Sequence, residues 1–179
     1  VKKKFLSYPN FHLIDLDKNQ GTVNAINIGI KKSVGKYVFI LGNDTKILKG
    51  WSKAIPSFFK QNPRAAVAQA KILRMGTNRF DYAGDYLGPF GFLIERAREA
   101  EDRKQFDKVT PIFSVKGGAM ICRKDIYQKL GGMESAYRFG WEEPDFTWRS
   151  WLAGYETYFL PTVTVFHAYG TGRKEIGYY

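Results

Sequence analysis

The stretch that decides the fold is Trp141-Glu142-Glu143-Pro144-Asp145-Phe146-Thr147-Trp148-Arg149, which is followed by Gly154-Tyr155 and by a lone His167. Three carboxylates fall within four residues, and Pro144 has the fixed φ that is favoured at a first helical position. Four apolar residues then recur at i, i+3, i+4 and i+7: Trp148, Trp151, Leu152 and Tyr155. This spacing predicts a helix that starts at the acidic turn and has one apolar face.

The acidic turn has two interpretations. Carboxylates at the positive end of a helix dipole stay ionised, so Glu142 and Glu143 could act as a general base or help to bind a metal. The alternative is an acidic first turn that only caps the helix, with Asp145 and Arg149 as an ordinary i,i+4 ion pair. Taken alone, the turn does not separate the two.

The rest of the chain predicts an α/β fold in one domain over residues 1–179. Helices are predicted for Thr22 to Lys32, Trp51 to Gln61 (interrupted or kinked by Pro56) and Lys124 to Leu130. Strands are predicted for Phe11 to Leu16, Tyr37 to Leu41, Ala65 to Leu73, Ile112 to Val115, Ala119 to Ile121, Thr157 to Leu160 and Val163 to Phe166. Such alternation implies right-handed crossovers around a sheet.

The region from Arg74 to Thr110 breaks this alternation. It holds several glycines and then a charged run from Glu95 to Lys108. We expect a long excursion over the active-site face, because long loops in compact domains are usually functional or mobile. We also expect part of the charged run to be helical.

The net charge of +11 allows three kinds of partner: nucleic acid, anionic lipid or a nucleotide diphosphate. No zinc-finger spacing, aromatic RNA-binding signature or helix-turn-helix pattern supports nucleic acid. The single cysteine, Cys122, excludes an intrachain disulfide and lies in an apolar run, which predicts a buried filler. No apolar run reaches transmembrane length, and no signal peptide is present in this sequence.

Several motifs in order resemble one known family. The motifs are Asn19-Gln20-Gly21-Thr22 with Ala25, Asn27 and Gly29; Gly35-Lys36-Tyr37; Leu41-Gly42-Asn43-Asp44-Thr45; Lys116-Gly117-Gly118-Ala119-Met120; Leu130-Gly131-Gly132; and the acidic turn with Leu152-Ala153-Gly154-Tyr155, Leu160-Pro161 and His167. From about Leu13 to His167 the chain resembles the family 2 glycosyltransferases. These are inverting, nucleotide-sugar-dependent enzymes of polysaccharide or glycoconjugate biosynthesis with the GT-A fold, a mixed sheet flanked by helices.

The resemblance also implies that the chain starts late. In that family about 50 residues precede the part that begins here at Phe11, and they supply most contacts to the base and ribose. We therefore expect the C-terminal three quarters of a catalytic domain, with an exposed sheet edge that favours self-association and with little or no activity of its own.

The sequence and the resemblance together suggest a metal site at Asp44 and His167. Asp44 follows a buried strand, where α/β sheets bind ligands, and a carboxylate suits Mg²⁺ or Mn²⁺. The family motif Asp-x-Asp reads Gly42-Asn43-Asp44 here, so the first acid is absent. His167 lies 24 residues after Glu143, where some members have a metal-binding histidine. A plain Asn-Asp-Thr turn and a structural histidine remain the alternatives.

The resemblance assigns the remaining roles. Glu143 would be the general base, with Glu142 as the fallback, although the family usually has aspartate at this position. The residues expected to bind substrate are Asn19, Gly21, Asn27, Asn43, Gly117, Gly118, Trp141, Asp145 and Arg149. The alternatives are an inactive sugar- or nucleotide-binding module of the same fold and a basic nucleic-acid-binding domain.

The expected partners follow from this function. They are a nucleotide-diphosphate sugar donor and a glycan or lipid-linked acceptor, with peripheral membrane contact and a homo-oligomer as further expectations and no nucleic acid. The expected location is cytoplasmic, extending to the inner face of the membrane.

Overall fold

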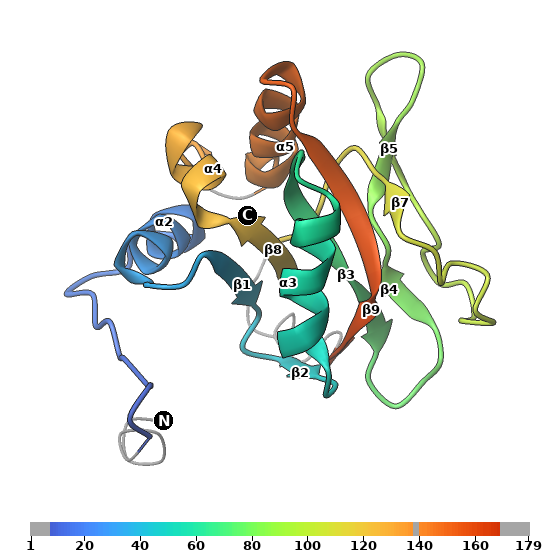
Figure 1. Cartoon of the computed structure of the whole chain (residues 1–179), viewed down its shortest axis with the longest axis horizontal. Coiled ribbons are helices and arrows are strands. Elements are labelled where there is room, and N and C mark those ends of the chain that lie inside the picture. Colours follow the sequence, from blue (N-terminus) through green and yellow to red (C-terminus); the bar gives the residue numbers. More distant parts are fainter. Residues whose placement is uncertain (1–7, 138–139, 169–179) are drawn as a thin grey trace, which may run out of the picture.

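The computed structural model describes residues 8–137 and 140–168 (Figure 1). A sheet and the helices that flank it make up the fold, and α2 is the first labelled helix. The elements in chain order are α2 (Thr22–Lys32), β1 (Tyr37–Leu41), β2 (Thr45–Ile47), α3 (Trp51–Gln61), β3 (Ala65–Arg74), β4 (Phe80–Tyr82), β5 (Asp85–Leu87), β6 (Leu93–Glu95), β7 (Thr110–Pro111), β8 (Ala119–Arg123), α4 (Lys124–Lys129), α5 (Glu142–Leu152) and β9 (Glu156–His167).

The main sheet is mixed, with the order β1-β8-β3-β9-β2. Strands β3 and β9 are parallel, whereas β8 runs antiparallel to both β1 and β3. Strands β4 and β7 extend the sheet by pairing with β3 and β9. Strands β1, β3 and β9 therefore all point the same way, and their carboxyl ends lie at one edge.

The register between β3 and β9 contains a large irregularity. Ala70 pairs with Leu160, but the next residue, Lys71, pairs with Thr164, so three residues of β9 have no partner on β3. Beyond this bulge the pairing is regular and brings His167 opposite Arg74, the last residue of β3. The bulge begins at Pro161, which cannot donate to a ladder hydrogen bond.

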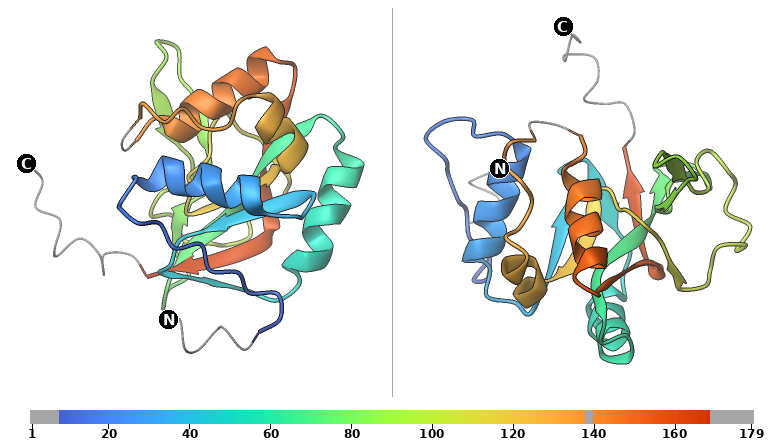
Figure 2. Two further views of the ribbon diagram at one scale, coloured as in Figure 1. Left: turned by 90° about the vertical axis from the view of Figure 1, so that its left-hand side faces the viewer. Right: turned by 90° about the horizontal axis from the view of Figure 1, so that it is seen from above.

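Two hydrophobic clusters cover the two faces of the sheet, and Figure 2 shows the helices on either side. One cluster joins residues of α2, α4 and α5 to the sheet, including Val23, Tyr127 and Phe146. The other joins Ile55 and Phe59 of α3 to the opposite face. Successive residues of β8 alternate between the clusters, as strand geometry requires. Cys122 is fully buried in the first cluster, as predicted.

Much of the predicted secondary structure is confirmed. The helices Thr22–Lys32 and Trp51–Gln61 and the strand Tyr37–Leu41 have the predicted bounds, and α3 continues through Pro56. The helix of the acidic turn forms as α5, but it starts at Glu142. Among the described residues, no helix is both long enough and apolar enough to cross a bilayer.

Four predictions of elements are wrong. Phe11 to Leu16 forms no strand, and none of the described strands pairs with it. The charged run is not helical, since Ala97, Glu99 and Lys104 have positive φ values that a right-handed helix excludes. Residues 112–115 make only an isolated bridge at Ser114. The two last predicted strands are one continuous strand, β9.

The predicted apolar face of α5 is also partly wrong. The residues of α5 that are buried against the sheet are Glu142, Phe146, Thr147 and Ser150. Trp148 is instead 45% exposed and Leu152 is 78% exposed. Trp151 is half-buried, and Tyr155 lies beyond the end of the helix, where it packs against the first cluster. The predicted face is therefore only partly directed to the core.

A buried lysine anchors the excursion between β3 and β8. The Nζ atom of Lys71 lies 2.7 Å from Asp102 Oδ2 and 2.6 Å from Asp107 Oδ1. Burial alone would lower the pKa of Lys71, but the hydrogen bonds to the two carboxylates outweigh it and raise this pKa above its ordinary value. The ion pairs therefore hold the charged run, from which both aspartates come, against β3.

We expect the substitution Asp102→Asn to destabilise the fold by about 1–3 kcal/mol, because it leaves a buried ammonium with one charged partner. Urea unfolding measures the change. The control is Arg103→Met, which removes an ion pair whose arginine is 78% exposed and should change stability by less than about 0.5 kcal/mol. Equal midpoints for Asp102→Asn and the unmodified chain would show that Lys71 does not anchor the excursion.

Candidate active site

The carboxyl-end edge of the sheet gathers most of the predicted site. The chain leaves β1 through Gly42 and Asn43 to Asp44, and His167 is the last residue of β9. Strand β8 starts at the same edge, immediately after Gly117 and Gly118. Segments distant in sequence therefore converge where α/β sheets characteristically bind ligands.

Asp44 and His167 are in direct contact. The Nε2 atom of His167 lies 3.0 Å from Asp44 Oδ2, and its Nδ1 atom lies 2.7 Å from Asp81 Oδ2. The side chains of Asp44 and His167 are 36% and 29% exposed, so the pair is accessible from solvent, whereas Asp81 is 16% exposed. Asp81 thus holds one ring nitrogen and orients the other toward Asp44.

Sequence reasoning missed Asp81. It lies on β4, inside the region from Arg74 to Thr110 where the pattern predicted no strand. The pairing of Leu73 with Phe80 folds β4 back onto the end of β3 and carries Asp81 to the edge that holds His167. The only local signal is that Phe80 and Tyr82 flank it, an apolar alternation too short to distinguish a strand.

The donor set suits a divalent cation that shares its coordination with a ligand. Asp44 offers carboxylate oxygen and His167 offers an imidazole nitrogen, and a second carboxylate behind a metal-binding histidine is the usual supporting arrangement. Over residues 8–137 and 140–168, no group of three or more histidine, cysteine or acidic side chains could hold an ion. These two side chains would hold such a cation only together with oxygen atoms from a bound ligand or water.

Glu143 lies at the start of α5 and reaches the loop before β8. Its Oε1 atom accepts a hydrogen bond of 2.7 Å from the backbone nitrogen of Gly117. A Cβ atom at residue 117 would lie 2.7 Å from this same oxygen, closer than real side chains approach, so a larger residue there would displace the carboxylate of Glu143. Gly117 therefore contacts the candidate base, and its predicted role in substrate binding stays a prediction.

The environment of Glu143 favours a base that titrates nearer to neutrality. Burial raises the pKa of Glu143 above the usual range of a glutamate, and the neighbouring charge of Glu142 raises it further. The hydrogen bond from Gly117 and the positive charge of Lys116 oppose these effects without cancelling them. Glu142 itself is buried, and its Oε2 atom has no hydrogen-bond partner among the described residues.

A short series of contacts connects Glu143 to Asp44. Gly117 bonds Glu143, and the oxygen of the next residue, Gly118, accepts a hydrogen bond of 3.1 Å from the nitrogen of Gly42. A Cβ atom at Gly42 would lie 2.8 Å from Asp44 Oδ1, so a carboxylate side chain at residue 42 would crowd Asp44 as it stands. The candidate base and the candidate metal site thus share one wall.

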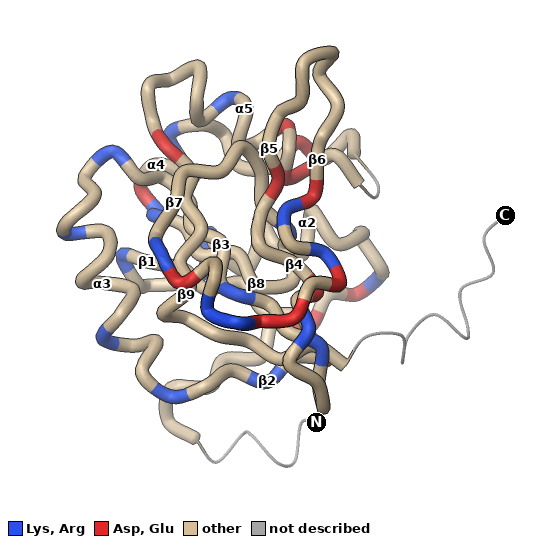
Figure 3. The backbone as a smooth tube through the Cα atoms, turned by 90° about the vertical axis from the view of Figure 1, so that its right-hand side faces the viewer, with Lys and Arg blue, Asp and Glu red and all other residues tan. Residues whose placement is uncertain are grey.

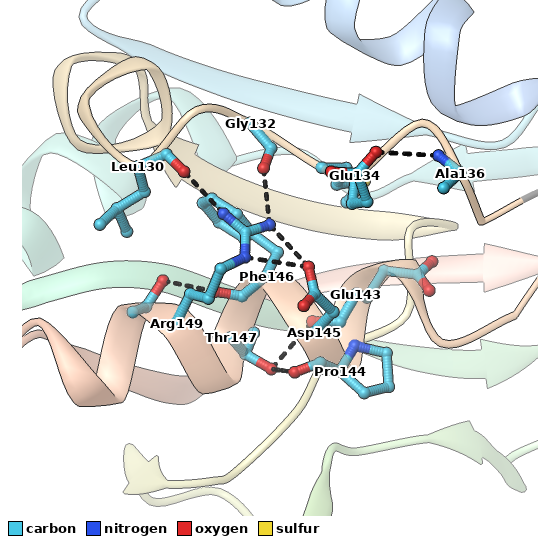
Figure 4. Close-up of polar contacts among 12 residues, drawn as sticks. Leu130, Gly132, Glu134, Ala136, Glu143, Pro144, Asp145, Phe146, Thr147 and Arg149 are labelled. Carbon is cyan, nitrogen blue, oxygen red and sulfur yellow. Dashed lines mark hydrogen bonds and ion pairs between the residues drawn. The ribbon is translucent and has the colours of Figure 1, made fainter.

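Asp145 and Arg149 belong to a separate network, drawn in Figure 4. Both Nε and Nη2 of Arg149 bond to Asp145 Oδ2, at 3.0 and 2.7 Å. The same guanidinium donates to the carbonyl oxygens of Leu130 and Gly132. Figure 4 shows the carboxylate of Glu143 directed away from this network. The ion pair left open by the sequence is therefore present, and the predicted role of both residues in substrate binding stays a prediction.

The amide of Asn27 also serves the fold. Its Nδ2 atom donates to the oxygen of Met133, and its Oδ1 atom accepts from the hydroxyl of Tyr127. These bonds fix α2 to the loop between α4 and α5. Substrate binding by Asn27 stays a prediction, and any ligand there would compete with these bonds.

Three further residues predicted to bind substrate, Asn19, Gly21 and Asn43, lie at the surface. Asn19 Oδ1 accepts a 2.9 Å hydrogen bond from the nitrogen of Gly21, which has a φ of 81° and precedes α2. Asn43 is exposed in the turn before Asp44. No described contact assigns substrate to any of them, so these predictions remain untested.

An aromatic pocket of about 390 Å³ opens beside the acidic turn. Trp141, 61% exposed, lies on its wall with Asp145 and Pro144. The other lining residues are Leu87, Gly91, Leu93, Phe113, Tyr137 and Trp148. Aromatic rings at a pocket wall can stack on the apolar face of a sugar, which agrees with the predicted role of Trp141 without testing it. A second hollow, of about 620 Å³, includes Lys46 and Phe166 beside the His167 edge.

The mixed sheet with helices on both faces defines an α/β domain with a ligand-binding edge, and comparisons identify its family. The family model described as "Glycosyl transferase family 2" matches residues 1–131. The chain therefore belongs to glycosyl transferase family 2.

Known proteins that are similar to the chain include an enzyme of Caenorhabditis elegans and a solved structure. The Caenorhabditis elegans protein named "Probable N-acetylgalactosaminyltransferase 9" is 23% identical over 171 residues, which are 90% of this chain and 29% of that protein. The crystal structure of GalNAc-T7 with UDP, GalNAc and Mn²⁺ matches with a TM-score of 0.65 at 17% identity, over 85% of this chain and 31% of the other. This likeness establishes the GT-A fold that the sequence predicted. The chain spans less than a third of either relative.

Proposed function

We propose that this domain transfers a sugar from a nucleotide-diphosphate sugar to an acceptor hydroxyl with inversion, using Glu143 as the general base. The observation that carries the proposal is the position of Glu143: a half-buried carboxylate of raised pKa, held by Gly117 on the wall that it shares with Asp44 and His167. Family membership supports the reaction class.

Glu143 takes the proton of the acceptor hydroxyl, whose oxygen forms a bond to the anomeric carbon of the sugar. The bond from that carbon to the diphosphate oxygen breaks with its electron pair, and the nucleotide diphosphate leaves. A base on the face opposite to the leaving group gives inversion.

Asp44 and His167 would hold the divalent cation. When bound, Mg²⁺ or Mn²⁺ would neutralise charge on the leaving diphosphate. A neighbour whose structure holds UDP, GalNAc and Mn²⁺ makes Mn²⁺ and UDP-sugars the first choices for a test. The acceptor would be a glycan or a lipid-linked glycan, and the aromatic pocket beside Glu143 would accept its sugar rings.

The test is an incubation with UDP-GalNAc and other nucleotide sugars, with Mn²⁺ or Mg²⁺ and a panel of glycan acceptors. We expect release of the nucleotide diphosphate and a product with inverted anomeric configuration by NMR. Retained configuration would exclude Glu143 as an inverting base.

A second candidate function is an inactive module that binds nucleotide sugars. Gly42 favours it, because the first acid of the family's metal motif is absent and the space for one is restricted. Binding of nucleotide sugars without turnover, across the same panel, would support this candidate over the transferase.

Asp81 gives a further prediction for the metal site. We expect Asp81→Ala to weaken Mn²⁺-dependent binding of the nucleotide by roughly 10–100-fold, since the partner behind a metal-binding histidine orients its ring. Asp81→Asn keeps an oxygen that can accept from His167 and should restore part of the affinity. Calorimetry with UDP and Mn²⁺ measures both. Unchanged affinity in Asp81→Ala would show that the contact with His167 has no bearing on the ligand.

A further inference from the structure

The hairpin of β5 and β6 has a composition unlike the rest of the surface. Nine consecutive residues, from Tyr86 to Ile94, carry no charge. At its tip Phe90 is 92% exposed and Phe92 is 71% exposed. The hairpin extends away from the main sheet (Figure 1), and it belongs to its own two-stranded sheet.

Both faces of this hairpin are apolar. Leu87 pairs with Leu93, and both line the pocket beside α5. The adjacent pair, Tyr86 and Ile94, must point to the opposite face, where they are 41% and 52% exposed. A hairpin that packs on a core with one face normally has polar residues on the other face. Exposed apolar side chains on both faces and at the tip therefore indicate that this hairpin contacts an apolar partner.

The charges begin where the hairpin joins the body. Glu95 bonds to Arg98 at 3.0 Å and to Lys116 at 2.6 Å, and Asp85 is buried at the start of β5. Figure 3 shows this boundary, with charged residues at the base of β5 and β6 and none along the projecting loop. The apolar part extends about 13 Å from that boundary at the rise of a β-strand.

Two backbone hydrogen bonds close the tip. The nitrogen of Gly88 donates to the oxygen of Phe92 at 2.7 Å, and the nitrogen of Gly91 donates to the oxygen of Gly88 at 3.1 Å. Internal hydrogen bonds reduce the cost of taking the loop out of water. The outer edges of the two strands stay open, which limits insertion to the interfacial region and the first part of the acyl layer.

We propose that residues 86–94 dock the domain to a lipid bilayer, with Phe90 and Phe92 inserted and the ion pairs of Glu95 left at the water boundary. A bilayer contacts the tip and both faces at once, whereas a sugar in the pocket contacts only the face of Leu87 and Leu93. Lysines of α3 and β2 lie away from this hairpin (Figure 3), and the cations at its base, Arg98 and Lys116, are paired with Glu95, so binding should not require anionic lipid. The inference does not depend on transferase activity.

Flotation of the chain with phosphatidylcholine vesicles, with and without phosphatidylserine, tests the proposal. Phe90→Ser/Phe92→Ser should weaken partitioning at least roughly tenfold on both kinds of vesicle. The matched control is Tyr8→Ser/Val34→Ser, which removes exposed apolar groups elsewhere and should float as the unmodified chain does. The proposal would be overturned if all variants floated equally with the vesicles. It would also be overturned if the unmodified chain did not float.

A labelling experiment locates the contact. Cys122 is buried and its pKa is raised to about 12 by burial, so a cysteine introduced by Phe90→Cys can be labelled selectively with a polarity-sensitive dye. Vesicles should increase emission from residue 90 but not from a dye on Val34→Cys. Self-association that depends on Phe90 and Phe92 in sedimentation, without a vesicle response, would assign the hairpin to a second copy of the chain and overturn the lipid proposal.

Discussion

Replacing Glu143 by glutamine should lower turnover by roughly 10²–10⁴-fold in a preparation that transfers sugar, which is the usual contribution of general base catalysis. Glutamine keeps an oxygen that can accept from Gly117, so the shape of the site should persist. Nucleotide affinity should barely change, because the lost interaction belongs to the transition state. Steady-state kinetics together with calorimetry for the nucleotide separate the two quantities.

The pH profile gives a second measurement on Glu143. Its carboxylate is the active form, and the pKa is raised, so activity should fall as pH drops through a value above that of an ordinary glutamate. Glu142→Gln removes the charge that contributes to this shift. We therefore expect its acidic limb to move to lower pH while much of the turnover remains.

Two results would contradict the assignment of the base. If Glu142→Gln is inactive and Glu143→Gln is active, the base is the neighbouring residue. If both retain activity, the acidic turn only starts α5 and the base lies elsewhere. Asp125→Asn is the matched control, because Asp125 pairs with Arg123 and lies outside this site.

Asp44→Ala should abolish the strengthening of nucleotide binding by Mn²⁺, a loss of roughly 100-fold or more. Loss of a group behind a metal ligand commonly costs 10–100-fold, and loss of the ligand itself should cost at least as much. In the absence of Mn²⁺ the variant and the unmodified chain should bind UDP equally weakly. Titration calorimetry with UDP, with and without Mn²⁺, measures this difference.

The matched control for charge is Asp125→Ala. Asp125 is on α4 and pairs with Arg123, which ends β8 away from the carboxyl-end edge. The substitution removes one carboxylate outside the proposed metal site, so Mn²⁺ should still strengthen nucleotide binding. Equal Mn²⁺-dependent affinity in Asp44→Ala and the unmodified chain would rule out Asp44 as a ligand.

Local patterns predicted those parts of the fold whose burial repeats along the chain. Thr22–Lys32 was predicted with its bounds because its apolar spacing matches the face that it buries. Tyr37–Leu41 was predicted from its continuous apolar run, although its residues are half-buried or exposed. The face of α5 was mispredicted because Trp148 and Leu152 point outward, while the polar Thr147 and Ser150 are buried and bond back to their own helix. The spacing of apolar residues cannot detect a buried polar residue whose side chain makes its hydrogen bond within its own helix.

The candidate site was also predicted only in part. Asp44, His167, Gly117 and Glu143 were predicted from motif order, and the fold brings them to one edge. Asp81 could not be predicted, because its contact with His167 joins residues 86 positions apart through a short strand with no periodic signal. The packing of the hairpin against the pocket was equally inaccessible to sequence patterns.

The three unpaired residues of β9 set how far that strand reaches. If they entered the ladder in regular register, His167 would end about 10 Å beyond Arg74 at the rise of a strand, and neither Asp44 nor Asp81 could meet it. The bulge at Pro161 therefore takes up three residues of chain without lengthening the paired strand. A substitution that drew these residues into the ladder would silence the domain while every residue of the edge stayed intact, whereas removal of all three would leave the register of His167 unchanged.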